Sequence, residues 1–423
     1  MVSTNAHLRL IDRPCGTGKT SQMLKSFQEN KCYIVILPTL DEVERVIRDA
    51  SVPFLQPDVD NSDHETKREH LRELLLSGQN VATTHKLYQE VAILAREGLL
   101  DQYHICLDEV LDVCAAVDGK SSRSFEQFYV KGGYARVDHK GRVSTTPKWE
   151  AELDAVSDTL SVSLYRLAKA EMLHYVDGTF FMWALPQELL TAGASFTIYT
   201  YLAEGSTLLA YLNKLQIPYL HDVDVALEAR FRAKAKQLVT IKDIPSMSKV
   251  NLTYSGQTQG KSVAKVVSRS LRSLRRGELK DVPLSNVLIT SVKNKWYAKG
   301  NDDPKSRKAG CFAVGTKMFK DVTWIANTTR GTNNFAHATH LVYLYDQNMN
   351  PFIKRWLGLA SDLEAQDRYA LTELIQWAYR SRVRMGEPIT LFLPSKRMRG
   401  LLENWLQDGG KPEVIVPEKR LAA

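Results

Sequence analysis

The sequence has no long apolar run, no paired cysteines and no low-complexity tract. No uninterrupted apolar stretch approaches about 18 residues, the length expected of a membrane-spanning helix, which excludes an ordinary transmembrane protein. The five cysteines stand singly with no C-x-x-C pair, which argues against a zinc site or a disulfide framework and fits a reducing compartment. The first residues, MVSTN, lack the basic start and apolar run of a secretory signal, so we expect a cytoplasmic protein.

Charge is distributed unevenly along the chain. Residues 226–423 carry about 34 lysines and arginines against about 17 acids, whereas residues 1–225 carry about 22 against about 31. A strongly basic second half indicates either a surface that meets a polyanion or a solvated lysine-rich face. Charge alone does not distinguish these two interpretations.

Short apolar runs alternate with helical stretches in both halves, and this pattern predicts mostly parallel α/β sheets. A chain of 423 residues is also longer than one core usually holds. We therefore predict two tandem α/β domains, residues 1–225 and 226–423, with an insert in the first at about 112–190. In that insert, residues 125–143 are predicted to form a hairpin.

A glycine-rich turn follows the first predicted strand and precedes a helix. Glycines in this setting allow backbone N–H groups to wrap a phosphate chain, so the turn predicts a site for ATP. Lys19 would reach the β- and γ-phosphates, and the Thr20 hydroxyl would bind Mg²⁺. Arg13 stands where the widespread form of this loop has its first glycine. The predicted nucleotide-binding residues are Pro14, Cys15, Gly16, Thr17, Gly18, Lys19 and Thr20.

Two adjacent acids, Asp108 and Glu109, end the apolar strand HICL. Such a pair is costly at the end of a buried strand unless the charges have partners or a function. In nucleotide-driven motors the first acid holds Mg²⁺ and the second polarises the water that attacks the γ-phosphate. We therefore predict Asp108 as a metal ligand and Glu109 as the catalytic base.

The order of these and later elements resembles superfamily 2 helicases of the DExD/H type over nearly the whole chain. The resemblance is closest to phage-encoded and herpesvirus-type origin-binding helicases. It rests on the LDEV form of the carboxylate motif and on the absence of glycines from the arginine-rich element at residues 376–384. Residues 197–201 (TIYTY) stand where the family couples its two activities. Elements that resemble those contacting the nucleic-acid backbone contain Pro38, Thr39, Thr83, Thr84, His85, Thr290, Ser291, Thr328 and Arg330. Elements that resemble those facing the nucleotide contain Gly331, Asn333, Gln376, Arg380 and Arg384.

This resemblance implies two RecA-like domains that use ATP and Mg²⁺ to move along or unwind nucleic acid, DNA being favoured. It implies catalytic roles for Lys19, Asp108, Glu109, Gln376, Arg380 and Arg384. We predict a helicase or translocase of phage replication or recombination, in the host cytoplasm, with single-stranded or forked DNA and other replication or recombination proteins as partners. Two alternatives remain open: an ATPase that remodels RNA or displaces proteins, and a degenerate binding module, which Tyr201, Asn333 and the absent glycines suggest.

Three finer predictions concern side chains near these elements. If residues 380–384 are helical, Arg380 and Arg384 share one face and Arg382 points away. Lys and aromatic residues at 293–299 would either bind a single strand or, for Trp296, pack in the core. The aromatic residues predicted to part or stack on bases are Phe125, Phe128, Tyr129 and Tyr134.

Overall fold

The structure is a computed structural model that describes residues 7–59, 64–117, 122–152, 161–259, 261–298, 306–329 and 334–407. The chain forms two compact units. The first comprises Met1–Ile11, Gly18–Asp222 and Met349–Ala365. The second comprises Asp12–Thr17, Val223–Asn348 and Gln366–Ala423. Each unit therefore includes a short segment from the other half of the sequence.

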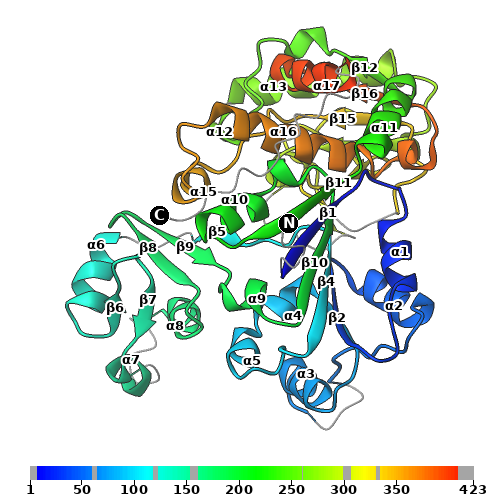
Figure 1. Ribbon diagram of the computed structural model, residues 1–423. Coiled ribbons are helices and arrows are strands. Elements are labelled where there is room, and N and C mark those ends of the chain that lie inside the picture. Colours follow the sequence, from blue (N-terminus) through cyan, green and yellow to red (C-terminus); the bar gives the residue numbers. More distant parts are fainter. Residues whose placement is uncertain are drawn as a thin grey trace. The chain divides into compact units, whose positions relative to one another are not determined.

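The first unit is built on a six-stranded sheet in the order β11-β1-β10-β4-β2-β3 (Figure 1). Strand β4 pairs in parallel with β10 on one side and β2 on the other, and β2 pairs in parallel with β3. β2 reads CYIVIL and is buried from Tyr33 to Leu37, as expected of a strand covered on both faces. The strands are β1 (Leu8–Asp12), β2 (Cys32–Leu37), β3 (Val81–Thr84), β4 (Tyr103–Asp108), β10 (Ser195–Thr200) and β11 (Tyr219–Val223).

Hydroxyl side chains begin several helices of this unit. Thr39 accepts a hydrogen bond from the backbone N–H of Glu42 at the start of α2, and Thr66 forms a reciprocal capping box with Glu69 in α3. The helices are α1 (Lys19–Lys25), α2 (Leu40–Asp49), α3 (Lys67–Leu76), α4 (His85–Gln89), α5 (Ala92–Arg96), α9 (Glu188–Thr191), η2 (Ala203–Gly205) and α10 (Thr207–Lys214).

The predicted insert has a small core of its own within the first unit. Strands β5 and β8 flank β9 in an antiparallel sheet, and β6 pairs with β7 in a hairpin. Trp149 and Phe181 lie at the centre of this core with almost no exposed surface. The elements are β5 (Cys114–Val117), α6 (Ser122–Ser124), η1 (Phe125–Val130), β6 (Ala135–Val137), β7 (Val143–Thr145), α7 (Pro147–Glu152), α8 (Val162–Lys169), β8 (Leu173–Val176) and β9 (Phe180–Ala184).

The prediction of one hairpin over residues 125–143 is wrong for its first part. Phe125–Val130 forms a wide, π-type helical turn, and only β6 and β7 form the hairpin. Phe125 and Tyr129 lie on the same side of this turn, stack at 5.2 Å and are buried in the insert core. Core packing therefore overrides the strand preference of these aromatic residues.

Helix α15 (Pro351–Trp356) comes from the second half of the sequence but packs in the first unit. Its Trp356 stacks on Tyr211 at 5.5 Å and meets His174 at 5.6 Å. Its Arg355 forms an ion pair of 2.7 Å with Asp177, in the turn between β8 and β9. Nothing in the periodicity of this segment indicated where it would dock.

The second unit contains a five-stranded sheet in the order β12-β16-β15-β13-β14, and all its pairs are parallel. The pairs are in register over apolar residues, for example Ile289 with Val342 and Leu341 with Leu391. The strands are β12 (Val239–Lys242), β13 (Val287–Thr290), β14 (Thr323–Trp324), β15 (His340–Tyr343) and β16 (Ile389–Phe392).

Amphipathic helices surround this second sheet. Helix α13 contributes Val267 and Leu271 to a core that also contains Trp296, and all three are fully buried. The helices are α11 (Val225–Leu238), η3 (Pro245–Met247), α12 (Tyr254–Gln259), α13 (Lys261–Arg276), η4 (Leu284–Asn286), α14 (Lys293–Trp296), α16 (Leu363–Ala378), η5 (Arg382–Met385) and α17 (Lys396–Gln407). Among the described residues, no helix combines the length and apolar character that crossing a membrane requires.

Candidate active site

The predicted phosphate loop connects β1 to α1. Gly16 has φ 77° and Gly18 has φ 82°, a left-handed conformation that glycine adopts without steric cost. The Thr17 hydroxyl donates a 2.9 Å hydrogen bond to the carbonyl of Pro14 and so closes the turn. A Cβ at Gly18 would meet no atom within 4 Å, which leaves room beside the backbone for a ligand. The loop thus has the glycine-dependent shape that a phosphate cradle needs.

Thr20 and Asp108, which lie 88 residues apart in the sequence, meet in the first unit. The Thr20 hydroxyl donates a 2.8 Å hydrogen bond to Oδ2 of Asp108. Asp108 is the last residue of β4 and is buried. Lys19, beside Thr20, acts electrostatically on the same carboxylate. The structure therefore brings together the predicted metal-binding hydroxyl, the predicted metal-binding carboxylate and the phosphate-loop lysine.

Glu109 has a backbone conformation that is unusual for a residue with a side chain. Its φ is 63°, and its N–H donates a 2.9 Å hydrogen bond to the carbonyl of Tyr199 in β10. Left-handed backbone at a non-glycine residue costs about 1–3 kcal/mol and is concentrated at functional sites. The Glu109 side chain, which directly follows the last residue of β4, is half-buried. Strain at this one position is consistent with a positioned carboxylate.

Burial, together with the neighbouring charge of Glu109, raises the pKa of the Asp108 carboxyl to about 6, although the Thr20 hydrogen bond and the charge of Lys19 oppose this shift. A cation would relieve the repulsion between these two carboxylates. The hydroxyl and carboxylate oxygens of Thr20 and Asp108 fit Mg²⁺, which takes oxygen ligands and retains several waters. The residues present are thus suited to hold the metal of a Mg²⁺–nucleotide complex.

We expect Mg²⁺–ATP binding to release protons near pH 6. Without nucleotide, Asp108 is half protonated near its pKa of about 6, and the metal requires the ionised form. Binding should release about half a proton at pH 6 and almost none at pH 8, so affinity should rise as pH increases through 6. Calorimetry in two buffers of different ionisation enthalpy measures this release. Equal release at both pH values, or unchanged release in Asp108→Asn, would contradict the assignment.

The Thr-Thr-His element lies beside the acids. His85 Nε2 is 3.0 Å from the backbone carbonyl of Asp108, and Thr84 caps α4 by accepting from the N–H of Leu87. The Thr83 side chain is buried, and its hydroxyl has no hydrogen-bond partner among the described residues. The sequence assigned His85 to the nucleic acid, and its contact with the end of β4 was not predicted. His85 therefore connects this element to the acid pair.

The other elements assigned to the nucleic-acid backbone differ in exposure. Pro38 and Thr39 are half-buried at the end of β2, where Thr39 also caps α2. Thr290, the last residue of β13, and Ser291 directly after it are buried, whereas Thr328 is exposed. Arg330, Gly331 and Asn333 lie outside the described residues. Trp296 is fully buried, so the core alternative is correct for this side chain.

The helical interpretation of residues 380–384 is wrong. Helix α16 ends at Ala378, Ser381 is extended with φ −85° and ψ −174°, and a short 3-10 turn begins at Arg382. Arg380 and Arg384 therefore do not share the face of one α-helix. The sequence pattern failed because the arginines fit a helical spacing, whereas the chain breaks the helix between them.

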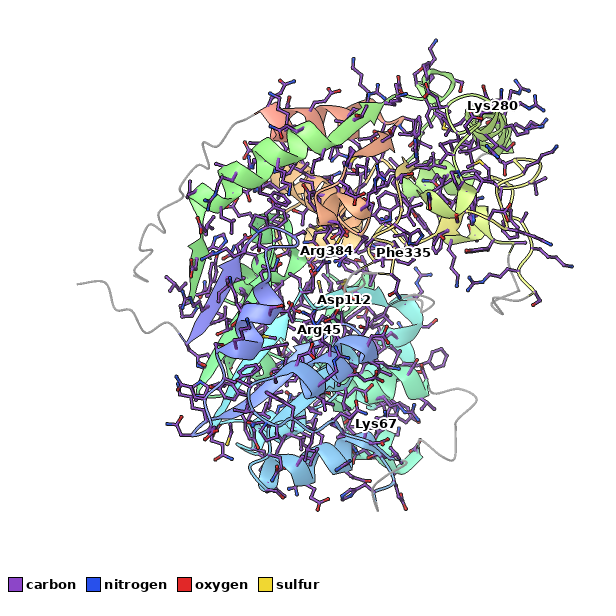
Figure 2. All side chains as sticks on the ribbon, turned by 90° about the vertical axis from the view of Figure 1, so that its right-hand side faces the viewer. Arg45, Lys67, Asp112, Lys280, Phe335 and Arg384 are labelled. Carbon is purple, nitrogen blue, oxygen red and sulfur yellow. The ribbon has the colours of Figure 1, made fainter. Side chains whose placement is uncertain are left out.

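The three arginines have different surroundings. Arg380, two residues beyond the end of α16, is 3% exposed, and Gln376 in the last turn of this helix is also buried. Arg382 donates from Nε to the carbonyl of Pro388 and lies 3.5 Å from the Glu387 carboxylate. Arg384 (Figure 2) lies against the phosphate-loop segment of the second unit, because a Cβ on Gly16 would be 3.2 Å from its Cγ. Proximity to the loop thus distinguishes Arg384 from Arg382.

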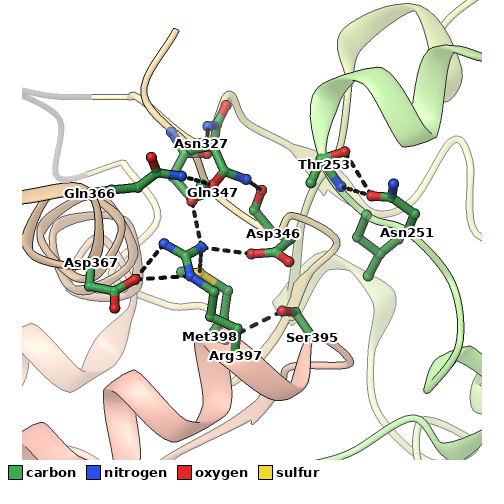
Figure 3. A network of polar contacts seen from close by, with 12 residues as sticks. Asn251, Thr253, Asn327, Asp346, Gln347, Gln366, Asp367, Ser395, Arg397 and Met398 are labelled. Atoms are coloured by element: carbon green, nitrogen blue, oxygen red, sulfur yellow. Dashed lines mark hydrogen bonds and ion pairs between the residues drawn. The ribbon is translucent and has the colours of Figure 1, made fainter. Parts of the chain in front are cut away.

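A polar network fixes the residue that precedes the exposed Thr328. Gln347 accepts a 2.7 Å hydrogen bond from the Asn327 amide, and its carbonyl accepts one of 2.8 Å from Arg397 (Figure 3). Arg397 also binds the carboxylates of Asp346 and Asp367. Helix α17, the end of β15 and α16 are therefore connected around this loop. Neither Gln347 nor Arg397 belongs to a motif that the sequence revealed.

Comparisons with known proteins agree with this architecture. Residues 233–406 match the family described as the YonV C-terminal Rossmann-like domain. The chain is 25% identical over 418 residues to the SPbeta prophage-derived uncharacterized protein YonV of Bacillus subtilis strain 168, covering 95% of this chain and 99% of that protein.

Solved structures give the fold. An apo structure of XPD matches with TM-score 0.50 and 14% identity, covering 94% of each chain. A structure of the XPD helicase matches with TM-score 0.47 and 13% identity over the same shares. The predicted fold class, two tandem RecA-like parallel-sheet domains, is confirmed by the likeness of the fold to that of XPD.

Proposed function

We propose that this protein is an ATP-driven DNA helicase or translocase that acts in phage replication or recombination. The hydrogen bond between Thr20 and Asp108 carries the proposal, because it joins the end of the phosphate loop to the acid pair, the two elements expected to share a Mg²⁺ ion. The XPD-like fold supports a motor, and the prophage-derived relative supports the phage context. The placement beside herpesvirus-type origin-binding helicases stays a prediction.

In this proposal each residue near the loop has a separate task. The backbone N–H groups of residues 15–20 and the Lys19 ammonium bind the phosphates. Thr20 and Asp108 would hold Mg²⁺, which would neutralise phosphate charge. Glu109 accepts the proton of the attacking water. Arg384, and Arg380 with it, stabilise the charge on the γ-phosphate, while Gln376, Gly331 and Asn333 face the nucleotide.

Nucleic acid is held in this proposal through its phosphates, without reading sequence. Thr328 is exposed and Thr39 and Thr84 are half-buried, and side-chain hydroxyls such as these make sequence-independent contacts with phosphate oxygens. Arg330 adds a cation to this set. The substrate is single-stranded or forked DNA, and other replication or recombination proteins would act on the same substrate.

Steady-state ATP turnover with and without single-stranded DNA tests the proposal, followed by strand separation on matched DNA and RNA duplexes. We expect DNA to stimulate turnover and forked DNA to be unwound. Turnover stimulated only by RNA would favour the RNA-remodelling alternative. Nucleic-acid binding without any ATP turnover would favour the degenerate binding module.

Phe128 is the most exposed of the four aromatic residues predicted to contact bases. Its side chain is 69% exposed, whereas Phe125 and Tyr129 are buried, so the base-stacking prediction is wrong for those two. Tyr134 is half-buried, donates a hydrogen bond of 2.6 Å to Glu152 and lies beneath the Lys148 ammonium, so its contact with bases stays a prediction. We expect Phe128→Ala to spare ATP turnover and weaken forked-DNA binding by roughly five- to hundredfold, the range of one lost base stack.

Phe125→Ala is the matched control for Phe128→Ala, because it removes the same ring from the core of the same insert. It should lower the free energy of unfolding by about 3–5 kcal/mol. Thermal unfolding and fluorescence anisotropy with forked DNA distinguish the two variants. Unchanged DNA binding in Phe128→Ala would restrict the insert to a structural role.

A further inference from the structure

Helix α13 of the second unit presents a continuous basic face. Lys265, Arg269, Arg272 and Arg276 are exposed and follow one another at intervals of four, three and four residues. This spacing places them on one side of a helix. Leu271, on the opposite side, packs in the core of the unit. At 1.5 Å per residue, the basic face extends over about 16 Å.

This helix has no acidic residue in its 16 positions. Other surface helices pair their charges internally: Arg45 of α2 (Figure 2) meets Glu42, and Arg232 of α11 meets Glu228. Like charges at four-residue spacing destabilise a helix, so an unrelieved basic face has an energetic cost. A bound polyanion would remove this repulsion.

The described part of the chain provides no carboxylate for this face. None of Lys265, Arg269, Arg272 or Arg276 forms an ion pair with a described residue, although Arg272 Nε donates to the carbonyl of Ser268. The nearest acid along the chain, Glu278, is paired with Lys242. The charged ends of the four side chains are therefore available to an external partner.

Further cations extend the basic face. The turn Gly315–Lys317 lies beside it, since a Cβ on Gly315 would be 4.0 Å from Arg272 Nη1, and Lys317 is exposed. Lys280 (Figure 2), just after the helix, is also exposed. No acidic residue lies within α13 itself, so the row of cations on this helix is uninterrupted. The surface is thus suited to a regular row of negative charges.

The absence of aromatic residues on α13 indicates the kind of nucleic acid. Surfaces for single strands combine cations with aromatic rings on which bases stack. A face made only of lysine, arginine and serine contacts phosphates and lacks the aromatic rings on which the bases of a single strand stack. Such a face fits a duplex, whose bases are inside and whose phosphates are outside.

We propose that α13, through Lys265, Arg269, Arg272 and Arg276, binds the phosphate backbone of a nucleic-acid duplex. None of these four residues belongs to the elements around Thr84 and Thr328 that the proposed function assigns to the single strand. The proposal rests on the proposed function and deepens it, because it assigns a place for the double-stranded part of a forked substrate. Binding there is independent of base sequence and is weakened by salt.

The test replaces three arginines without changing helix-forming tendency, as Arg269→Gln, Arg272→Gln and Arg276→Gln in the full-length protein. Binding of a blunt duplex and of a single strand of the same length is measured by fluorescence anisotropy over a range of salt. The slope of log affinity against log salt for the duplex should become less negative by about 2.7, since each lost phosphate contact accounts for about 0.9. Single-strand affinity and ATP turnover stimulated by a single strand should change less than about twofold, because α13 lacks stacking residues.

Two control variants identify the cause of any effect. The triple variant Arg230→Gln, Lys236→Gln and Lys396→Gln removes three exposed cations elsewhere in the same unit and should retain duplex binding. The triple arginine-to-lysine variant on α13 retains the charge and should retain most of the slope. If it instead behaved like the glutamine variant, charge would not be the cause and the proposal would be overturned.

Each remaining outcome has one interpretation. An unchanged duplex slope in the glutamine variant, or a loss equal to that of the control triple, would overturn the role of α13 while leaving the motor proposal intact. Equal losses for duplex and single strand would also overturn it, because α13 would then belong to the single-strand path. Binding to acidic polypeptide in preference to duplex would assign the face to a protein partner. If the unmodified protein bound neither nucleic acid, the proposed function itself would fail.

Discussion

Glu109→Gln is expected to retain ATP binding and to lower ATP turnover by about 10²–10⁴-fold, the usual contribution of a general base. Glutamine keeps the size of the side chain and removes only its ability to accept a proton. The left-handed backbone at Glu109 and its hydrogen bond to Tyr199 should persist, since they do not depend on the carboxylate. Binding of a fluorescent ATP analogue and single-turnover hydrolysis measure the two quantities separately.

Two controls accompany the Glu109→Gln measurement. Asp112→Asn makes the same kind of exchange three residues later, at an exposed acid (Figure 2), and should leave turnover unchanged. Lys19→Ala should abolish turnover by weakening phosphate binding itself, so it would lower affinity as well as rate. Normal turnover in Glu109→Gln would show that the catalytic base is another residue.

Arg384→Ala is expected to reduce ATP turnover by about 10³-fold or more while leaving DNA binding largely intact. Arg384 is the arginine of its element whose side chain lies against Gly16 of the phosphate loop, and the proposed function therefore assigns it to the γ-phosphate. Arg380→Ala should have a similar effect on turnover, but Arg380 is buried, so its replacement also removes packing. Rapid-mix hydrolysis and DNA anisotropy distinguish turnover from binding.

Arg382→Ala is the matched control on the same short segment. Its side chain is engaged by Pro388 and Glu387, and a surface pair of this kind is worth at most about 1 kcal/mol. Turnover should therefore fall less than about tenfold. Loss of activity in Arg382→Ala with tolerance in Arg384→Ala would exclude the assignment.

The helices and strands around the site could be predicted from the sequence because each is specified by a local pattern of residues. The run CYIVIL predicts a buried strand, and the glycines at 16 and 18 predict a turn that only glycine adopts easily. The acid pair after HICL and the loop before Thr20 predicted two halves of one site. Their contact at 2.8 Å follows from parallel strands, whose carboxyl ends lie at one edge of the sheet.

Features that depend on contacts between residues far apart in the sequence could not be predicted from it. An aromatic residue such as Phe125 or Trp296 can either bind a base or pack in a core, and the sequence around it does not distinguish these two roles. The folded structure buries both side chains. The break at Ser381 has no proline or glycine to mark it, so the arginine spacing was misleading. His85 and Arg397 likewise act through partners far away in sequence.

The docking of α15 has a consequence for dividing the protein into pieces. A fragment of residues 226–423 would carry Trp356 away from Tyr211 and His174, and would lack the segment Asp12–Thr17 that belongs to its own unit. The complementary fragment would leave the faces of Tyr211 and Phe180 uncovered. Neither piece is self-sufficient, so separately produced halves should aggregate alone and become soluble when produced together. A single proteolytic cut near residue 225 should accordingly leave the two products associated.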